Sequence, residues 1–293
     1  MTTLIEILSP DFLLRQALIG SVLVGLICPL VGVYFVLRRM IFLGVALPQV
    51  SAAGIAFAAL IHQIVTSLYV HLDLNQRGLA VIGSLSFTLI GLLVLAAFER
   101  QRETVEARIG ITYAVAAAAT MLFLAANPSA EAHMVNLLKG DILATTGLSL
   151  TLMVGVFGAV VLVLMAFRKE FLLVSFDRDM AMVFGKHVGL WDMLLYLTIG
   201  ITISLGVMTA GPIVTFGFLV VPPFTARLIT RRMLTFSLTS TGLGAVTAFA
   251  GFYCAYRFDL PLGPAEVALA SLVLVVVWTA NRFYHLLGRW WAT

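Results

Sequence analysis

Charged residues are scarce in this sequence, and the scarcity extends over the whole chain. Only 11% of its 293 residues are Asp, Glu, Lys or Arg, whereas 61% are hydrophobic. A water-soluble domain would carry roughly a quarter charged residues, and no polar block of domain size interrupts the apolar runs. The composition therefore predicts a polytopic membrane protein without an appended soluble domain, and we expect no nucleic-acid partner.

Several chemical signatures are also missing. The chain has two cysteines, Cys28 and Cys254, both within apolar runs, whereas a disulfide framework or a thiolate metal site needs more cysteines or a closely spaced pair. No nucleophile–base pair or H-E-x-x-H pattern occurs in the apolar segments, so we do not expect an enzyme. No G-x-x-x-x-G-K-[ST] phosphate-binding loop occurs. An ATP-driven step would therefore need a separate polypeptide.

Long apolar segments dominate what is present. A membrane-spanning helix needs about 20 mostly apolar residues, and nine candidate segments lie near residues 13–37, 42–64, 79–98, 109–126, 142–167, 189–209, 212–229, 235–256 and 263–281. The sixth and seventh meet at Ala210-Gly211-Pro212, so they could form one broken or re-entrant unit, and eight spans is the alternative. No repeat or low-complexity linker divides the chain, which predicts one all-α transmembrane domain over residues 1–293.

The basic residues predict the orientation, because cytoplasmic loops carry an excess of Lys and Arg. With the N-terminus outside, fourteen of the eighteen basic residues fall on the cytoplasmic side. Only Arg15, Arg77, Lys139 and Arg257 remain for the outside. The asymmetry predicts an N-out, C-in topology.

The second predicted span begins with two arginines and then thins out to small residues around Pro48 and Gln49. It reads RRMIFLGVALPQVSAAGIAFA, residues 38–58. Small residues let helices approach closely or leave a narrow lumen, and Pro48 frees a backbone carbonyl one turn earlier. Gln49 can pair with such a group between helices, or it can face a transport pathway, and both interpretations stay open.

The longest loop on the expected cytoplasmic side contains a short amphipathic segment, residues 176–188. Asp177 and Asp179 stand near its start, Ala181 in its middle, and Gly185 at a predicted helix end. The segment is either a solvated connecting helix or an element that docks into a partner's groove. Spacing alone does not decide between the two.

Three stretches, in order, resemble the integral-membrane permeases of bacterial ABC importers for zinc, manganese and iron. They are the 38–58 stretch, FDRDMAMVFGKHVGLWDMLLYL, and GVMTAGPIVTFGFLVVPPFTARLIT with RFDLPLGPAEVALAS downstream. The resemblance covers nearly the whole chain. It implies a permease in the bacterial cytoplasmic (inner) membrane that imports a divalent metal by alternating access.

The resemblance also implies partners. A second permease copy, or a related chain, would complete the pathway, and an extracellular or periplasmic solute-binding protein would deliver the substrate. Cytoplasmic ABC ATPase subunits would bind ATP and Mg²⁺, and this chain would bind no cofactor. The 176–188 segment would couple the ATPase subunits to the permease, with ATPase contacts at Asp177, Asp179, Ala181 and Gly185.

The second span departs from the family in one respect. Typical metal-importing members carry an Asp at the place of Val45 and a His at the place of Gln49, a spacing that puts both on one helical face. Valine cannot bind a metal, and a neutral carboxamide is a weak ligand for zinc and its neighbours. The cargo could therefore be a metal chelate or another small solute, and an ATP-independent carrier or channel is a third hypothesis.

The candidate site residues follow from these interpretations. We expect the substrate pathway to include Val45, Pro48, Gln49, Ser51 and, at the outer mouth, Glu266. A metal leaving its carrier protein could meet Glu131, His133 or His62 near the outside. These three are weaker candidates, because lone loop histidines are more often solvated.

Overall fold

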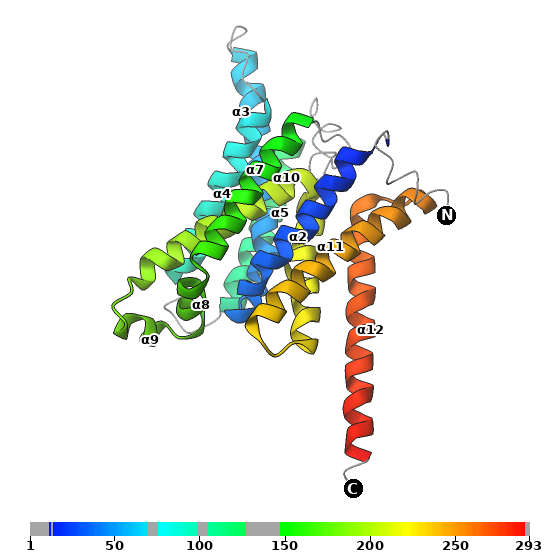
Figure 1. Cartoon of the computed structure of the whole chain (residues 1–293). Helices are drawn as coiled ribbons and strands as arrows, with labels where there is room; N and C mark the ends of the chain where they lie inside the picture. The colour runs from blue at the N-terminus through cyan, green and yellow to red at the C-terminus, as the bar shows by residue number, and fades with distance from the viewer. Residues whose placement is uncertain (1–11, 13, 69–75, 99–104, 127–146, 291–293) are drawn as a thin grey trace.

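The structure is a computed structural model that describes residues 12, 14–68, 76–98, 105–126 and 147–290. Within these ranges every regular element is a helix (Figure 1), which confirms the all-α prediction. The helices are α2 (Arg15–Leu37), α3 (Leu43–Leu68), α4 (Gln76–Phe98), α5 (Val105–Ala125), α7 (Gly147–Ala166), α8 (Arg168–Phe176), α9 (Arg178–Val183), α10 (Val188–Ile229), α11 (Met233–Phe258) and α12 (Leu262–Trp290).

The long helices follow the apolar segments of the sequence closely. Seven helices in the described ranges are long and apolar enough to cross a membrane. Helices α7 and α8 meet at an angle of 67° and raise this number to eight if they form one bent span. A polytopic membrane bundle is therefore confirmed, whereas the number of spans and the N-out orientation stay predictions.

Helix α10 is too long for one straight span and breaks at Gly211. Its 42 residues would extend about 63 Å as a straight helix, roughly twice the thickness of the hydrocarbon core. Gly211 has φ 82° and ψ 166°, a conformation open essentially to glycine alone. A Cβ added at Gly206 would lie 2.9 Å from Cγ2 of Thr215, so the chain folds back on itself (Figure 1). The predicted break at 210–212 is present.

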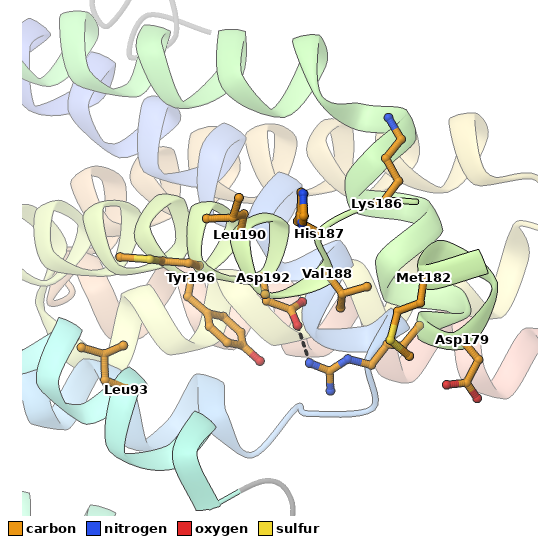
Figure 2. Close-up of a pocket in the computed structure, with 12 residues that line it drawn as sticks. Leu93, Asp179, Met182, Lys186, His187, Val188, Leu190, Asp192 and Tyr196 are labelled. Atoms are coloured by element: carbon orange, nitrogen blue, oxygen red, sulfur yellow. Dashed lines mark hydrogen bonds and ion pairs between the residues drawn. The ribbon is translucent and has the colours of Figure 1, made fainter. Parts of the chain in front are cut away.

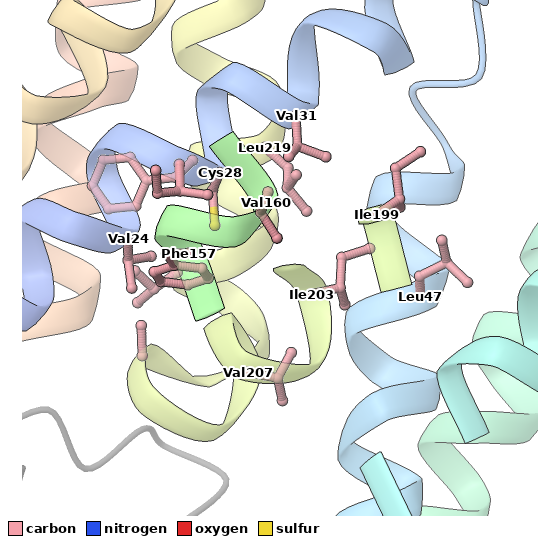
Figure 3. Close-up of a cluster of buried hydrophobic side chains, with 14 of the residues drawn as sticks. Val24, Cys28, Val31, Leu47, Phe157, Val160, Ile199, Ile203, Val207 and Leu219 are labelled. Atoms are coloured by element: carbon pink, nitrogen blue, oxygen red, sulfur yellow. The ribbon is translucent and has the colours of Figure 1, made fainter. Parts of the chain in front are cut away.

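Helix α2 lies in the core of the bundle and packs against both α10 and α11. Figure 3 shows the largest buried cluster, whose labelled residues are Val24, Cys28 and Val31 of α2, Leu47 of α3, Phe157 and Val160 of α7, and Ile199, Ile203, Val207 and Leu219 of α10. Cys28 is fully buried there. Both cysteines are free thiols.

Glycines bring α2 and α11 into direct backbone contact. A Cβ added at Gly244 of α11 would overlap the backbone oxygen of Gly25 and the Cγ of Pro29, both in α2. The hydroxyl of Ser240, one turn away on α11, donates a hydrogen bond of 3.1 Å to the backbone oxygen of Pro29. Small residues at such a crossing are the usual means by which membrane helices approach closely.

Candidate transport and coupling sites

The α3 residues predicted to lie on the substrate pathway divide between two faces of the helix. Val45 and Gln49 share one face and are both half-buried. Phe42, one turn earlier on that face, is 55% exposed. The side chain of Gln49 forms no hydrogen bond with any residue in the described ranges, so it does not link two helices there. This face of α3 is therefore only partly covered by the described part of the chain.

Ser51 lies on the opposite face and is completely buried. Its hydroxyl lies 2.6 Å from that of Ser84 in α4, which in turn lies 2.7 Å from the hydroxyl of Ser204 in α10. Three helices are therefore joined by one chain of hydroxyl groups. Pro48 is also buried, so the structure places Ser51 and Pro48 within helix packing, apart from Val45 and Gln49.

Replacing Ser84 with alanine is expected to destabilise the bundle by about 1–2 kcal/mol, because two buried hydroxyls lose their shared partner. Thermal unfolding of the purified protein in detergent measures the effect. Ser86 lies on the same helix but is exposed, so Ser86→Ala is the matched control and should leave the midpoint unchanged. Equal midpoints for the two variants would show that the hydroxyl chain does not stabilise the fold.

The predicted outer-mouth residue Glu266 is fully buried near the start of α12. Its carboxylate accepts a hydrogen bond of 2.5 Å from Ser21 of α2, and its backbone packs against Gly251 of α11. These contacts differ from those of α3, which packs chiefly against α4, α5 and α10. The structure therefore does not bring Glu266 and Gln49 together.

The weaker metal candidates are not assembled into a site in the described ranges. His62 lies half-buried in α3, and Glu131 and His133 lie outside the described residues. The described part of the chain contains no group of three or more His, Cys, Asp or Glu side chains that could hold a metal ion. The metal roles of these three residues stay predictions.

The amphipathic segment forms a short, well-capped helix, α9. The carboxylate of Asp177 accepts a hydrogen bond of 2.9 Å from the backbone N–H of Met180, which is the pattern of an N-cap. At the other end Gly185 adopts φ 70°, and the backbone N–H of Lys186 donates to the carbonyl of Ala181 at 3.0 Å. This is a Schellman-type end, so the predicted helix end at Gly185 is confirmed.

One side of α9 packs on the protein and the remainder is open. Ala181 is fully buried, whereas Asp179 is exposed. The exposed apolar side chains in and beside α9 are Phe176, Met180, Met182, Val183 and Phe184, each at least half exposed. Apolar side chains exposed together on a polar segment mark an interaction site.

A groove of about 970 Å³ runs between α9, the start of α10 and Leu93 of α4. Figure 2 shows Asp192 and Tyr196 of α10 at its inner wall and Met182 and Asp179 of α9 at its rim. The groove is therefore bounded by the segment to which the family resemblance assigns ATPase contacts and by the helix that follows it.

A charged cluster that the sequence analysis did not identify lies behind this groove. Asp192, in the second turn of α10, is 5% exposed and pairs with two guanidinium groups. One belongs to Arg178 of α9, an interaction drawn as a dashed line in Figure 2. The other belongs to Arg38, which follows α2, at 2.8 Å. A buried acid inside an apolar segment requires basic partners. The position of Asp192 within such a segment was therefore the sequence signal that could have indicated this cluster.

These features define the class of the protein. A bundle of apolar helices carries, at one end, a short capped helix with an exposed apolar surface and a groove beside it. The sequence contains no nucleotide-binding loop of its own. Together these features define a helical, multi-pass membrane protein with an open apolar surface at one end.

The family is shown directly by comparison of sequences. The chain belongs to the ABC 3 transport family, whose sequence profile matches residues 11–281. It is therefore the permease subunit of an ABC transporter, a non-enzymatic, multi-pass protein of the cytoplasmic membrane, as the resemblance implied.

Two relatives extend over almost the whole chain. The "Manganese transport system membrane protein MntC" of Halalkalibacterium halodurans is 27% identical over 98% of this chain and 93% of its own length. The "Probable iron transport system membrane protein" of Haemophilus influenzae is 28% identical over 98% of this chain and 96% of its own length.

Solved structures support the same fold. "PsaBC from Streptococcus pneumoniae in complex with Fab" is 24% identical, with a TM-score of 0.77 and 93% coverage of both chains. "An inward-facing conformation of a putative metal-chelate type ABC transporter" is 16% identical, with a TM-score of 0.70, and covers 92% of this chain and 85% of that one. At these identities the comparison concerns the fold alone.

Proposed function

We propose that this chain imports a divalent metal ion, with manganese and iron as the first candidates and zinc as the third. The observation that carries the proposal is the end-to-end similarity to membrane proteins of manganese and iron transport systems. The half-open face of α3 at Val45 and Gln49 supports a pathway that is completed by a second copy or a related chain. Substrate would arrive from a solute-binding protein on the outer side.

The driving force in this proposal comes from a separate ATPase that binds ATP and Mg²⁺. Helix α9 is the docking element: its caps keep it folded, and its exposed apolar side chains fit a partner's groove. Asp177, Asp179 and Gly185 would lie at the contact. Ala181 would not touch the ATPase, because it is buried against the permease itself. It would instead seat α9 on the bundle.

A specific observation favours a second candidate cargo, a metal chelate. Neither Val45 nor Gln49 offers a strong ligand to a bare ion, and the described residues contain no cluster of metal-binding side chains. A chelated metal keeps its own ligands and needs only a cavity of matching shape and polarity. An ATP-independent carrier or channel is less consistent with α9, whose exposed surface would then lack a role.

Reconstitution separates these candidates. The chain is purified with its ATPase and solute-binding protein, placed in liposomes and assayed for ATP-dependent uptake of manganese, iron and zinc. Uptake of a bare metal supports the first candidate. Failure for every bare metal, together with intact ATP hydrolysis, would favour the chelate, and uptake by the chain alone without ATP would overturn the ABC mechanism.

Charge reversal at the start of α9 is expected to abolish ATP-driven uptake. Asp177→Lys with Asp179→Lys replaces two negative charges at the proposed contact with positive ones and removes the N-cap, which costs about 1 kcal/mol. Uptake and ATPase binding are measured in the reconstituted complex. The control is Asp177→Asn, which keeps a capping side chain without its charge. Full uptake by the double variant would show that the ATPase does not dock through these residues.

A further inference from the structure

Helix α9 has few connections to the rest of the protein. Among the described elements it packs chiefly on α8 and on α10. Beside the buried Ala181, two charged side chains hold the α9 segment. Lys186 pairs with Glu170 of α8 at 3.5 Å, and Arg178 pairs with Asp192 of α10. Any force applied to α9 therefore enters the membrane bundle through a small number of identifiable contacts.

The two ion pairs differ in their burial and in the helices that they connect to α9. The Lys186–Glu170 pair is partly exposed on both sides, with 40% and 24% of the side chains accessible, and Glu170 lies on α8. The ammonium group of Lys186 also lies 5.9 Å from the ring centroid of Trp191 on the surface of α10. The Arg178–Asp192 pair leads inwards, because the side chain of Asp192 is only 7% exposed and also contacts Arg38. One carboxylate thus lies between a guanidinium of the docking helix and a guanidinium of the bundle.

Arg38 connects the cluster to the proposed pathway helix. It directly follows α2 and precedes α3 by a turn of four residues, in which Arg39 has a positive φ of 56°. The side chain of Arg38 is 9% exposed. It also donates hydrogen bonds to Ser175 of α8 at 3.0 Å and to Tyr196 of α10 at 3.5 Å. The turn that leads into α3 and helix α9 therefore both contact the carboxylate of Asp192.

The burial of this cluster indicates a positional role. Removing a carboxylate and a guanidinium from water costs free energy that their attraction only offsets, so apolar side chains would hold these helices together at least as well. Hydrogen bonds from charged groups, in contrast, fix relative positions by direction and distance. Arg178 donates one to Asp192, and Arg38 donates to Ser175 and Tyr196. The contact between Arg38 and Asp192 is an ion pair without a hydrogen bond. Asp192 fixes α9, the first turns of α10 and the α2–α3 turn relative to one another.

We propose that Arg178, Asp192 and Arg38 form a relay that transmits the movement of the ATPase-bound α9 to the base of α3. This inference rests on the proposed function, because it assumes that an ATPase moves α9. The three are positioning residues: they touch no substrate, and they determine whether ATP hydrolysis moves the helix that carries Val45 and Gln49.

Arg178→Gln is the primary test, because Arg178 is half exposed and its replacement leaves the Arg38–Asp192 pair intact. The variant is assayed as the complete complex with its ATPase in liposomes. We expect ATP hydrolysis and ATPase binding close to the parent values, and about tenfold fewer substrate molecules imported per ATP. Arg178→Lys restores a positive charge and should recover most of the coupling. Lys186→Gln breaks the other ion pair and should behave as the parent.

A second readout does not depend on the identity of the cargo. Spin labels at Ser67→Cys, near the far end of α3, and at Thr235→Cys on α11 report the position of α3, in a background where Cys28 and Cys254 are alanine. In the parent complex we expect trapped nucleotide to change the distance between the labels. In Arg178→Gln that change should be lost, and in Lys186→Gln it should persist.

The outcomes distinguish the relay from the proposed function. A normal distance change and normal import per ATP in Arg178→Gln would overturn the relay and leave the importer assignment standing. A parent complex that changes distance but imports none of the three metals would overturn the metal assignment, while the labels still decide the relay. Asp192→Asn is the supporting variant. It weakens both ion pairs of Asp192, and its coupling defect should not add to that of Arg178→Gln, since both variants interrupt the same relay.

Discussion

Alanine at Gly244 is expected to destabilise the permease by about 1–3 kcal/mol, the usual cost of forcing an extra methyl group into a filled core. The added carbon would overlap the backbone oxygen of Gly25 and the ring of Pro29. Neither group can rotate away, so α2 and α11 must separate. Because α2 lies in the core of the bundle, we expect reduced transport as well. The thermal unfolding midpoint in detergent measures the loss of stability.

Gly242 provides a matched control two residues earlier on the same helix. A Cβ added there would meet nothing within 4 Å, and alanine is favoured over glycine in a helix by up to about 1 kcal/mol. Gly242→Ala should therefore be neutral or slightly stabilising. If both variants had the same midpoint, the close α2–α11 crossing would not contribute to stability.

Introducing Asp at Val45 together with His at Gln49 is expected to create a metal-binding station on α3. The two positions lie on one helical face and are half-buried, so a carboxylate and an imidazole there would keep access to solvent or to a second chain. We expect tighter binding of zinc or manganese to the purified permease, by about tenfold or 1.4 kcal/mol. Isothermal titration calorimetry measures this affinity.

The two single variants are the controls, because each supplies only one ligand and should bind metal more weakly than the pair. In transport, the double variant should shift the preference towards bare metal if the native cargo is a chelate. Unchanged affinity and unchanged cargo preference would show that this face of α3 does not line the pathway.

Much of the architecture could be predicted because it depends on local composition. The apolar segments fix where the long helices lie, and Gly211 next to Pro212 fixes the break in α10. The ends of the short helix α9 were also predictable, because aspartate is favoured at helix N-caps and glycine just after helix C-termini, as at Asp177 and Gly185. Family resemblance then supplied the class of transporter.

The parts that could not be predicted depend on which helices become neighbours. Ser51 was expected along the pathway, yet its partners Ser84 and Ser204 are distant in sequence, and the structure places its hydroxyl between α3, α4 and α10. Arg38 belongs to the basic residues that predict the orientation, and its pairing with Asp192 joins residues more than 150 positions apart. Neither contact leaves a periodic pattern in the sequence.

The fold-back of α10 also bears on how the chain enters the bilayer during synthesis. The tip at Gly211 is buried, and its carbonyl accepts a hydrogen bond of 2.8 Å from Thr215, so this backbone group is satisfied within the protein. A turn without charged residues offers nothing to hold it in the headgroup layer. The two halves are therefore expected to leave the translocation channel together, as one helical hairpin, after α2 is already in place to receive them.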